Sequence, residues 1–183
     1  MEGASAARLW LVNRVDRRLR DGLRDLLDVL VEELAVVTAD AVALRGLSAD
    51  GRRLVPLAAH HPDVEVQAAL LAAMEETTEV GSSGIWQRVM AERTPQRWEL
   101  AAGDPPPETP ATRLGFLAQY PIRAVLAAPM IARGQLLGGV IVIRLVNDRP
   151  FSEDDEALVC AFADRAALGV DCLRTLGGFE AES

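Results

Sequence analysis

The sequence predicts an α+β fold, with a central antiparallel β-sheet between terminal helices on one side and an irregular helix and loop layer on the other. Apolar residues recur every three or four positions near both ends of the chain, as in long helices. Between these ends, strand-like runs come in pairs joined by short turns, as in hairpins. The run at 135–145 is apolar at almost every position, which is typical of a strand buried on both faces.

The first element predicted is a helix at 5–38, within an amino-terminal dimerisation or signalling segment at 1–38. Its apolar stripe consists of Val12, Val15, Leu19, Leu23, Leu26, Leu30, Leu34 and Val37. So narrow a stripe between mixed charges resembles a seam between helices. We therefore expect a homodimer whose interface contains Val12, Leu19, Leu23, Leu26 and Leu30. A helix that covers its own sheet is an equal alternative for the second half.

A hairpin of two strands at 39–47 and 52–61 follows, with Asp50 and Gly51 in its turn. Pro56 cannot donate to a ladder, so the second strand should lie at an edge or carry a bulge.

The middle of the chain should form the irregular layer. Its predicted parts are a helix at 62–77 capped by Asp63, a helix at 81–93, a strand at 94–100, a Pro-rich loop at 101–112 and a short helix at 113–120. An irregular cover leaves concavities, where ligand pockets are often found.

A hairpin within 122–145 and a final helix at 152–176 complete the predicted domain at 39–176, before a disordered tail at 177–183. Ser152 and Asp155 have the spacing of a capping box. In the second strand, alternation places Leu137 on the face of Ile141. The adjacent Gly138 and Gly139 predict a bulge or a close approach of another backbone.

The composition of the chain excludes several classes of function. The 183 residues carry a net charge of −8, which argues against a nucleic-acid partner. All 19 basic residues are Arg, so Schiff-base and P-loop lysine chemistry are excluded. The sequence shows neither a signal-peptide pattern nor a membrane-spanning run, so we expect a cytoplasmic protein with no membrane partner.

Cys160 and Cys172 lie twelve positions apart on the last predicted helix, about 18 Å along its axis. This separation is beyond disulfide reach, so we expect two reduced, buried thiols.

The run at 122–170 resembles the carboxy-terminal half of a GAF domain. The matching positions are Pro129, Gly134, Gly138, Phe151, Leu158, Phe162 and Ala166. The run at 81–98 resembles the family's glycine-started helix and Pro-led strand, and the run at 40–63 resembles its first hairpin. The resemblance covers about residues 25–176 and concerns turns, caps and core positions.

This resemblance implies a small-molecule sensory module of bacterial signal transduction, without enzymatic activity, that reports to a histidine kinase or transcriptional output partner. The Asn-Lys-Phe-Asp-Glu pattern of cyclic-nucleotide-binding members is absent. Both cysteines lie on the last helix, which suits neither a covalent bilin nor the reduction of methionine sulfoxide. We therefore expect no cofactor.

The residues expected to bind the ligand come from the middle region, where aromatic and basic side chains gather. They are Trp86, Arg88, Trp98, Arg113, Phe116, Tyr120 and Arg123. An apolar wall with an Arg would suit a small carboxylate or an aromatic acid. Core packing is the alternative for each aromatic residue.

Two alternative functions remain. A GAF-like domain without a ligand could serve as a dimerisation or protein-interaction module. A haem or chromophore sensor could use His60 or His61. No metal-ligand spacing and no nucleophile–base pair is present, so neither a metal site nor a catalytic site is expected.

Overall fold

The computed structural model describes residues 2–75, 77–82, 84–100, 114–145 and 149–177. The helices are α1 (Glu2–Thr38), α2 (Val64–Met74), α3 (Gly84–Glu92), α4 (Leu114–Gln119) and α5 (Glu153–Thr175), with a 3-10 turn, η1 (Val80–Ser82), before α3. Among the predicted parts, the Pro-rich loop, Arg113 and all of the predicted tail except Gly177 lie outside the described residues.

The six strands form one antiparallel sheet, which confirms the predicted α+β class. They are β1 (Ala41–Leu47), β2 (Arg53–His60), β3 (Thr78–Glu79), β4 (Gln96–Glu99), β5 (Ala124–Ala132) and β6 (Gln135–Arg144), in the order β3-β2-β1-β6-β5-β4. The central strands β1 and β6 are buried over most of their length. The two-residue strand β3 was not predicted, because so short a segment has no readable periodicity.

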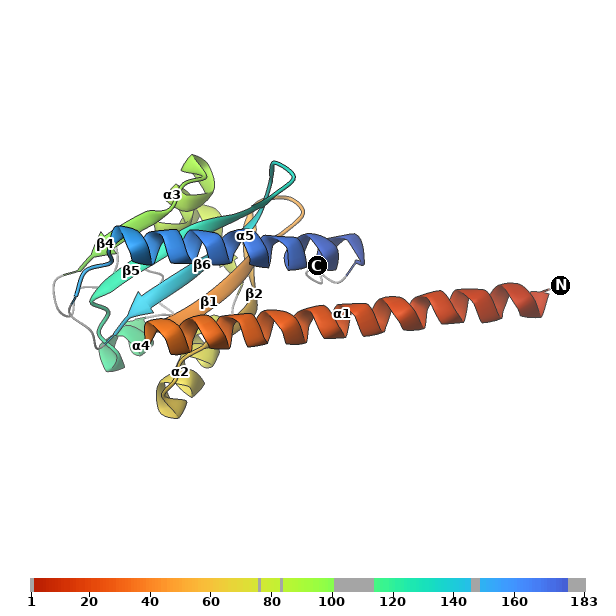
Figure 1. Cartoon of the computed structure of the whole chain (residues 1–183), viewed down its shortest axis with the longest axis horizontal. Helices are drawn as coiled ribbons and strands as arrows, with labels where there is room; N and C mark the ends of the chain where they lie inside the picture. Colours follow the sequence, from red (N-terminus) through yellow and green to blue (C-terminus); the bar gives the residue numbers. More distant parts are fainter. Residues whose placement is uncertain (1, 76, 83, 101–113, 146–148, 178–183) are drawn as a thin grey trace.

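Two layers of helices cover the sheet. Helices α1 and α5 lie side by side and antiparallel across one face, which we call the helix face (Figure 1). Helices α2, α3 and α4 contribute to the cover of the opposite face, which we call the lid face. The amino-terminal half of α1 extends well beyond the sheet (Figure 1).

The bulge predicted around Pro56 is confirmed. Strand β1 pairs Leu44 with Ala58 and Arg45 with Pro56, so Leu57 is the extra residue on β2. Strand β3 pairs with β2 only at Arg53 and Leu54, so Pro56 lies beyond that pairing, where the ladder to β1 is interrupted by the bulge.

The prediction for the faces of β6 was wrong at its start. Leu137 packs in the helix-face cluster with Val140, whereas Leu136 packs at the lid face with Ile141. The register shifts between Met130 and Ile131, next to Gly138, whose φ is +143°. One residue out of step exchanges the two faces of a strand, so simple alternation failed before the bulge.

The predicted helix starts at α2 and α5 are confirmed. The Asp63 carboxylate accepts hydrogen bonds from the backbone N–H groups of Glu65 (2.9 Å) and Val66 (3.2 Å). Ser152 and Asp155 form the reciprocal capping box at the start of α5. Both caps satisfy backbone donors that a helix leaves unpaired at its start.

Candidate functional site

The lid face of the sheet carries one apolar cluster. Its strands contribute mainly small or β-branched residues, and its helices contribute longer side chains. The buried members include Ala41, Ala43, Val125, Ala127 and Ile141 from the sheet, and Leu70, Met74, Ile85, Trp86, Val89 and Met90 from the helices. The sheet is therefore covered on this side also, as the predicted sandwich requires.

Trp86 packs directly against the middle of β6. A Cβ atom added to Gly139 would lie 2.5 Å from Cζ3 of Trp86 and 3.2 Å from Cε of Met90. Trp86 itself is only 4% exposed. The missing side chain at Gly139 thus provides the space for the indole ring.

The neighbouring Gly138 lies close to a different part of the sheet. A Cβ atom there would be 2.1 Å from the carbonyl oxygen of Arg45 on β1. Together with the register shift, this contact confirms the close backbone approach predicted from the two glycines.

Three of the predicted ligand-binding aromatic residues border this cluster. Trp98, Phe116 and Tyr120 are half-buried and pack against it, with the Phe116 and Tyr120 ring centroids 5.2 Å apart. Trp86 is part of the cluster core. Arg88 is exposed and is not a member of this cluster.

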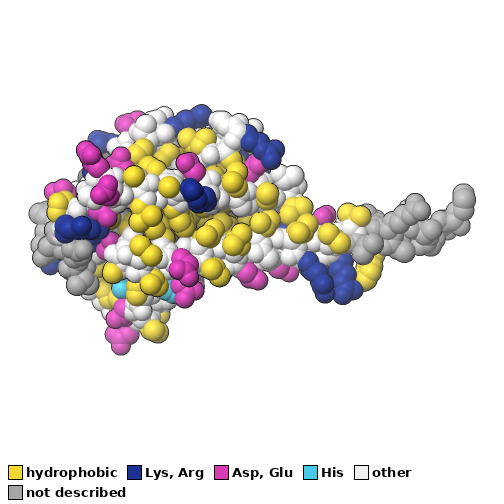
Figure 2. All heavy atoms as spheres, in the orientation of Figure 1, with side chains coloured by type: hydrophobic (Ala, Val, Ile, Leu, Met, Phe, Trp, Pro, Cys, Tyr) yellow, Lys and Arg dark blue, Asp and Glu magenta, His cyan; other side chains and the backbone are white. Residues whose placement is uncertain are grey.

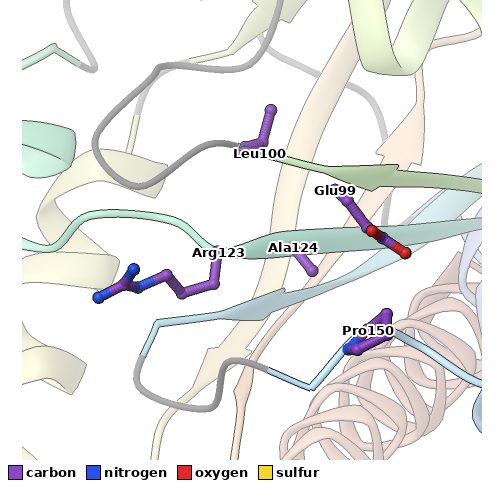
Figure 3. Close-up of a pocket in the computed structure, with 5 residues that line it drawn as sticks. All are labelled: Glu99, Leu100, Arg123, Ala124 and Pro150. Carbon is purple, nitrogen blue, oxygen red and sulfur yellow. The ribbon is translucent and has the colours of Figure 1, made fainter.

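Arg123, the remaining predicted residue that the structure describes, lies at a small cavity beside β4 and β5 (Figure 3). The cavity measures about 130 Å³ and is lined by Glu99, Leu100, Arg123, Ala124 and Pro150. The Glu99 carboxylate points toward Pro150, whereas the Arg123 guanidinium points the opposite way (Figure 3). Arg123, which directly precedes β5, and Trp98 of β4 lie at the same edge of the sheet.

Sequence reasoning missed a buried arginine on the lid face. Arg45 of β1 is 0% exposed, and its guanidinium donates to the carbonyl of Leu54 (3.3 Å) and to the hydroxyl of Thr78 (3.0 Å). It also lies 3.1 Å from the sulfur of Met74. Arg45 thus links β1, β2, β3 and the end of α2. An arginine inside the apolar run 41–47 was the signal that could have identified it.

A second buried arginine connects the sheet to both terminal helices on the helix face. Arg144 of β6 forms an ion pair with Asp40, which follows α1, at 3.1 Å. The guanidinium also donates to the carbonyl of Arg149 (2.5 Å) and stacks 3.9 Å from the Phe151 ring centroid. Asp155, in the first turn of α5, lies 3.9 Å away. We call Asp40, Arg144 and Asp155 the polar node.

The two carboxyl groups of the polar node have opposite pKa shifts. Burial raises the pKa of Asp40, although the Arg144 charge opposes that change. Burial also acts to raise the pKa of Asp155, but hydrogen bonds from Ser152 and the charges of Arg149 and Arg144 outweigh it and lower the pKa.

His61 has a structural role at the start of α2. Its Nδ1 accepts a hydrogen bond from the backbone N–H of Asp63 (2.9 Å), and the backbone N–H of His61 donates to Gln67 Oε1 (2.7 Å). The Nδ1 of His61 is therefore engaged by the backbone at the start of α2. Among the described residues, no group of three His, Cys, Asp or Glu could hold a metal ion.

The two cysteines are both free. Cys160 is half-buried, and burial followed by the charges of Glu156 and Asp164 raises the pKa of its thiol. Cys172 is exposed, so the prediction of two buried thiols was wrong for it. It lies on the side of α5 that faces away from the sheet.

Helix α1 carries two apolar stripes where the sequence suggested one. Leu27, Val31 and Leu34 are at most 4% exposed and pack on the sheet, so the second half of α1 does cover its own core. A separate outer stripe remains exposed. It consists of Val12 (55%), Val15 (47%), Leu19 (50%), Leu26 (48%), Val29 (52%) and Val36 (58%). These positions repeat every seven residues, the spacing of a helix–helix seam.

The predicted interface residues divide between these stripes. Val12, Leu19 and Leu26 belong to the outer stripe. Leu23 and Leu30 are half-buried, Leu23 against the helix-face core and Leu30 at a groove between α1 and α5.

Helix α5 adds its own outer stripe beside that of α1. It consists of Leu158, Ala161, Arg165, Leu168 and Cys172, again at spacings of three and four. Between the two stripes runs a largely apolar groove of about 370 Å³, lined by Leu30, Glu33, Leu34, Val37, Leu158, Ala161, Phe162 and Arg165. Figure 2 shows hydrophobic side chains gathered over α1 and α5 on this face. We call it the outer helical face.

None of the helices within the described part of the chain is both long and apolar enough to cross a membrane.

Comparison with known proteins accounts for this architecture. The GAF domain family model matches residues 22–170. A GAF domain/HD domain protein from Geobacter sulfurreducens superimposes with a TM-score of 0.65 at 18% identity, covering 83% of this chain and 94% of that one. The GAF domain of a phosphoenolpyruvate-protein phosphotransferase from Coxiella burnetii gives 0.65 at 20% identity, covering 95% and 99%.

The second GAF domain of DevS from Mycobacterium smegmatis is also similar, with a TM-score of 0.54 at 17% identity over 80% of this chain and 94% of that one. At these identities the solved structures establish the fold, whereas the family model covers most of the sequence. The chain belongs to the GAF domain family, a family of sensory and regulatory modules.

Proposed function

We propose that this GAF domain is a non-catalytic sensory module that binds a small molecule at the lid face and signals through self-association of its terminal helices. The outer helical face carries this proposal. Six large apolar side chains of α1 are about half exposed at heptad spacing, beside a matching stripe on α5. A soluble domain rarely leaves a contiguous apolar surface of this kind uncovered.

The lid edge formed by Trp98, Phe116, Tyr120 and Arg123 is the proposed ligand site. Half-buried aromatic side chains present apolar area together with polar tips, and the half-buried Arg123 would add a positive charge at this edge of the sheet. A small carboxylate or an aromatic acid fits this chemistry.

Contacts at the ends of the sheet support a link from the lid to the helices. Arg97 of β4 forms an ion pair with Glu156 of α5 at 2.9 Å and donates to the carbonyl of Phe151 at 3.2 Å. Arg144 of β6 binds Asp40 at the end of α1. A ligand that moves β4 or β6 would therefore act on both helices, provided that it favours one helix arrangement over another.

Sedimentation velocity tests self-association directly. The wild-type chain should form a dimer, and the Leu19→Asp/Leu26→Asp variant should be a monomer because two charges would be buried in the seam. Val64→Asp is the matched control, since Val64 is 81% exposed on α2, away from the outer helical face. A monomeric wild type, or a double variant that remains dimeric, rejects this part of the proposal.

Ligand binding needs its own test. Mass spectrometry of small molecules that co-purify with the chain, followed by thermal-shift screening of carboxylates and aromatic acids, should identify a binder. Trp98→Ala should weaken its binding about tenfold or more, whereas exposed Arg88→Ala should not. Equal loss in both variants would exclude the proposed site.

A second candidate is a dimerisation or protein-interaction module without a ligand. The packing of Trp86 and Met90 over Gly139 favours it, because these side chains fill the space above the middle of the sheet. Under this alternative the chain should be a dimer, but no compound should raise its melting temperature. This result separates the two candidates.

A further inference from the structure

The outer stripes of α1 and α5 each contain one charged residue, and the two charges are opposite. Along α1, the heptad positions from 12 to 36 are occupied by Val, Leu and Gly22 except at Glu33. Along α5, the positions from 158 to 172 are apolar or Cys except at Arg165. Both residues are exposed, and both line the groove between the helices.

Two contacts define the register of the antiparallel helix pair. Arg20 of α1 reaches the carbonyl of Leu176 at 3.4 Å, and Leu27 lies 3.3 Å from a Cβ built on Gly169 of α5. Counting along both helices from these contacts places Glu33 about 3 Å, or half a turn, from the level of Arg165 along the axis. The Arg165 guanidinium donates to the carbonyl of Ala161 at 2.6 Å, so its charge lies within the groove region.

Within one chain, Glu33 and Arg165 do not form an ion pair with each other. Among the described residues, neither Glu33 nor Arg165 has an ion-pair partner within 4.0 Å. Covering the groove with an apolar partner would therefore bury two charges without compensation, which is costly. A partner that brings the opposite charge to each of them avoids that cost.

We propose that the occupant of the groove is a second copy of this chain, and that Glu33 pairs with Arg165 of the partner subunit. The proposal rests on the self-association proposed above and specifies its geometry. A two-fold axis parallel to the helices leaves every residue at the same height along that axis in both subunits. Helix α1 then packs against α5 of the partner subunit, and the ion pair between Glu33 and Arg165 of the partner subunit forms twice.

The same charges disfavour the two simpler arrangements. A parallel pairing of α1 with α1 would place Glu33 against Glu33 of the partner subunit in an apolar seam. Pairing α5 with α5 would place Arg165 against Arg165 of the partner subunit. Like charges at such positions act against the wrong register, so the charge pattern selects the α1–α5 pairing.

Charge reversal distinguishes these arrangements by sedimentation equilibrium at about 0.15 M salt. Glu33→Arg and Arg165→Glu should each raise the dimer dissociation constant about tenfold or more, because each creates two like-charge contacts per dimer. The double variant Glu33→Arg/Arg165→Glu should return close to the wild-type value. Glu32→Arg makes the same charge change beside the stripe and should have little effect.

The outcomes separate this inference from the proposed function. If the wild type dimerises but the single reversals leave the constant unchanged, the α1–α5 pairing is wrong and self-association stands. The pairing is also wrong if the double variant is as weak as the singles. A wild-type monomer at every concentration overturns both. Glu33 and Arg165 are exposed in the single chain, so circular dichroism should show all four variants folded.

Discussion

The indole of Trp86 packs over Gly139 so closely that a side chain at residue 139 would overlap it, with a distance of 2.5 Å from Cβ to Cζ3. Trp86 belongs to α3 and Gly139 to the central strand β6. This contact anchors the lid to the middle of the sheet, and it determines how much room remains for a ligand there.

Gly139→Ala should therefore destabilise the fold by about 1–3 kcal/mol, because Trp86 and Met90 must move to admit one methyl group. Urea denaturation measures the loss, and tryptophan fluorescence should change at the same time. Gly115→Ala is the control, since a Cβ atom at Gly115 meets nothing within 4 Å. If Gly139→Ala were as stable as the wild type, the packing of Trp86 on Gly139 would not be what fixes α3 to the sheet.

The polar node should show strong coupling between its partners. Arg144→Met should cost about 3–5 kcal/mol in the free energy of unfolding, because it leaves the buried Asp40 without its main counter-charge. Replacing both, in Asp40→Leu/Arg144→Met, should destabilise the fold less than Arg144→Met alone. A double-mutant cycle measures this difference. Additive losses would mean that the pair is not energetically coupled.

Most of the fold could be predicted from the sequence, because local sequence patterns determine its helices and hairpins. The capping box at Ser152 and the bulge at Pro56 depend on neighbours a few residues away, and both were confirmed. The faces of Leu136 and Leu137 depended on a bulge within β6, where Leu137 is the extra residue, and strict alternation along the strand does not reveal it.

The candidate site was less predictable, since it depends on contacts between distant segments. The sequence placed Trp86 and Trp98 in the same region, but it could not say that one fills the core while the other borders it. The pairing of Arg144 with Asp40 spans 104 positions and leaves no local signature. The single apolar stripe read along α1 proved to be two stripes, because the sheet covers only one of them.

Stability should depend on pH through Asp155. Its pKa is lowered in the folded chain, so the ionised carboxylate contributes stability above the ordinary value of 3.8, and this contribution is lost as the pH falls through the folded value. Asp155→Asn should therefore cost about 1 kcal/mol at neutral pH, and the difference from wild type should shrink below about pH 4. Urea denaturation across this range measures it.

Asp154→Asn is the matched control for that experiment, because Asp154 is an exposed acid in the same helical turn but not a member of the capping box. Its effect at neutral pH should be smaller. A cost for Asp155→Asn that is the same at every pH would contradict the role assigned to its ionisation.

Two adjacent leucines of α1 should separate folding from self-association. Leu27 is 1% exposed and lies against Gly169 of α5, whereas Leu26 is 48% exposed on the outer stripe. Leu27→Ala should lower the free energy of unfolding by about 2–5 kcal/mol at any protein concentration, because it leaves a cavity. Leu26→Ala should change the stability of the isolated chain by less than about 0.5 kcal/mol but weaken the dimer several-fold. Thermal unfolding at several concentrations, beside sedimentation, measures both effects. If Leu26→Ala unfolded the chain as Leu27→Ala does, the outer stripe would be part of the fold and could not serve as a separate interface.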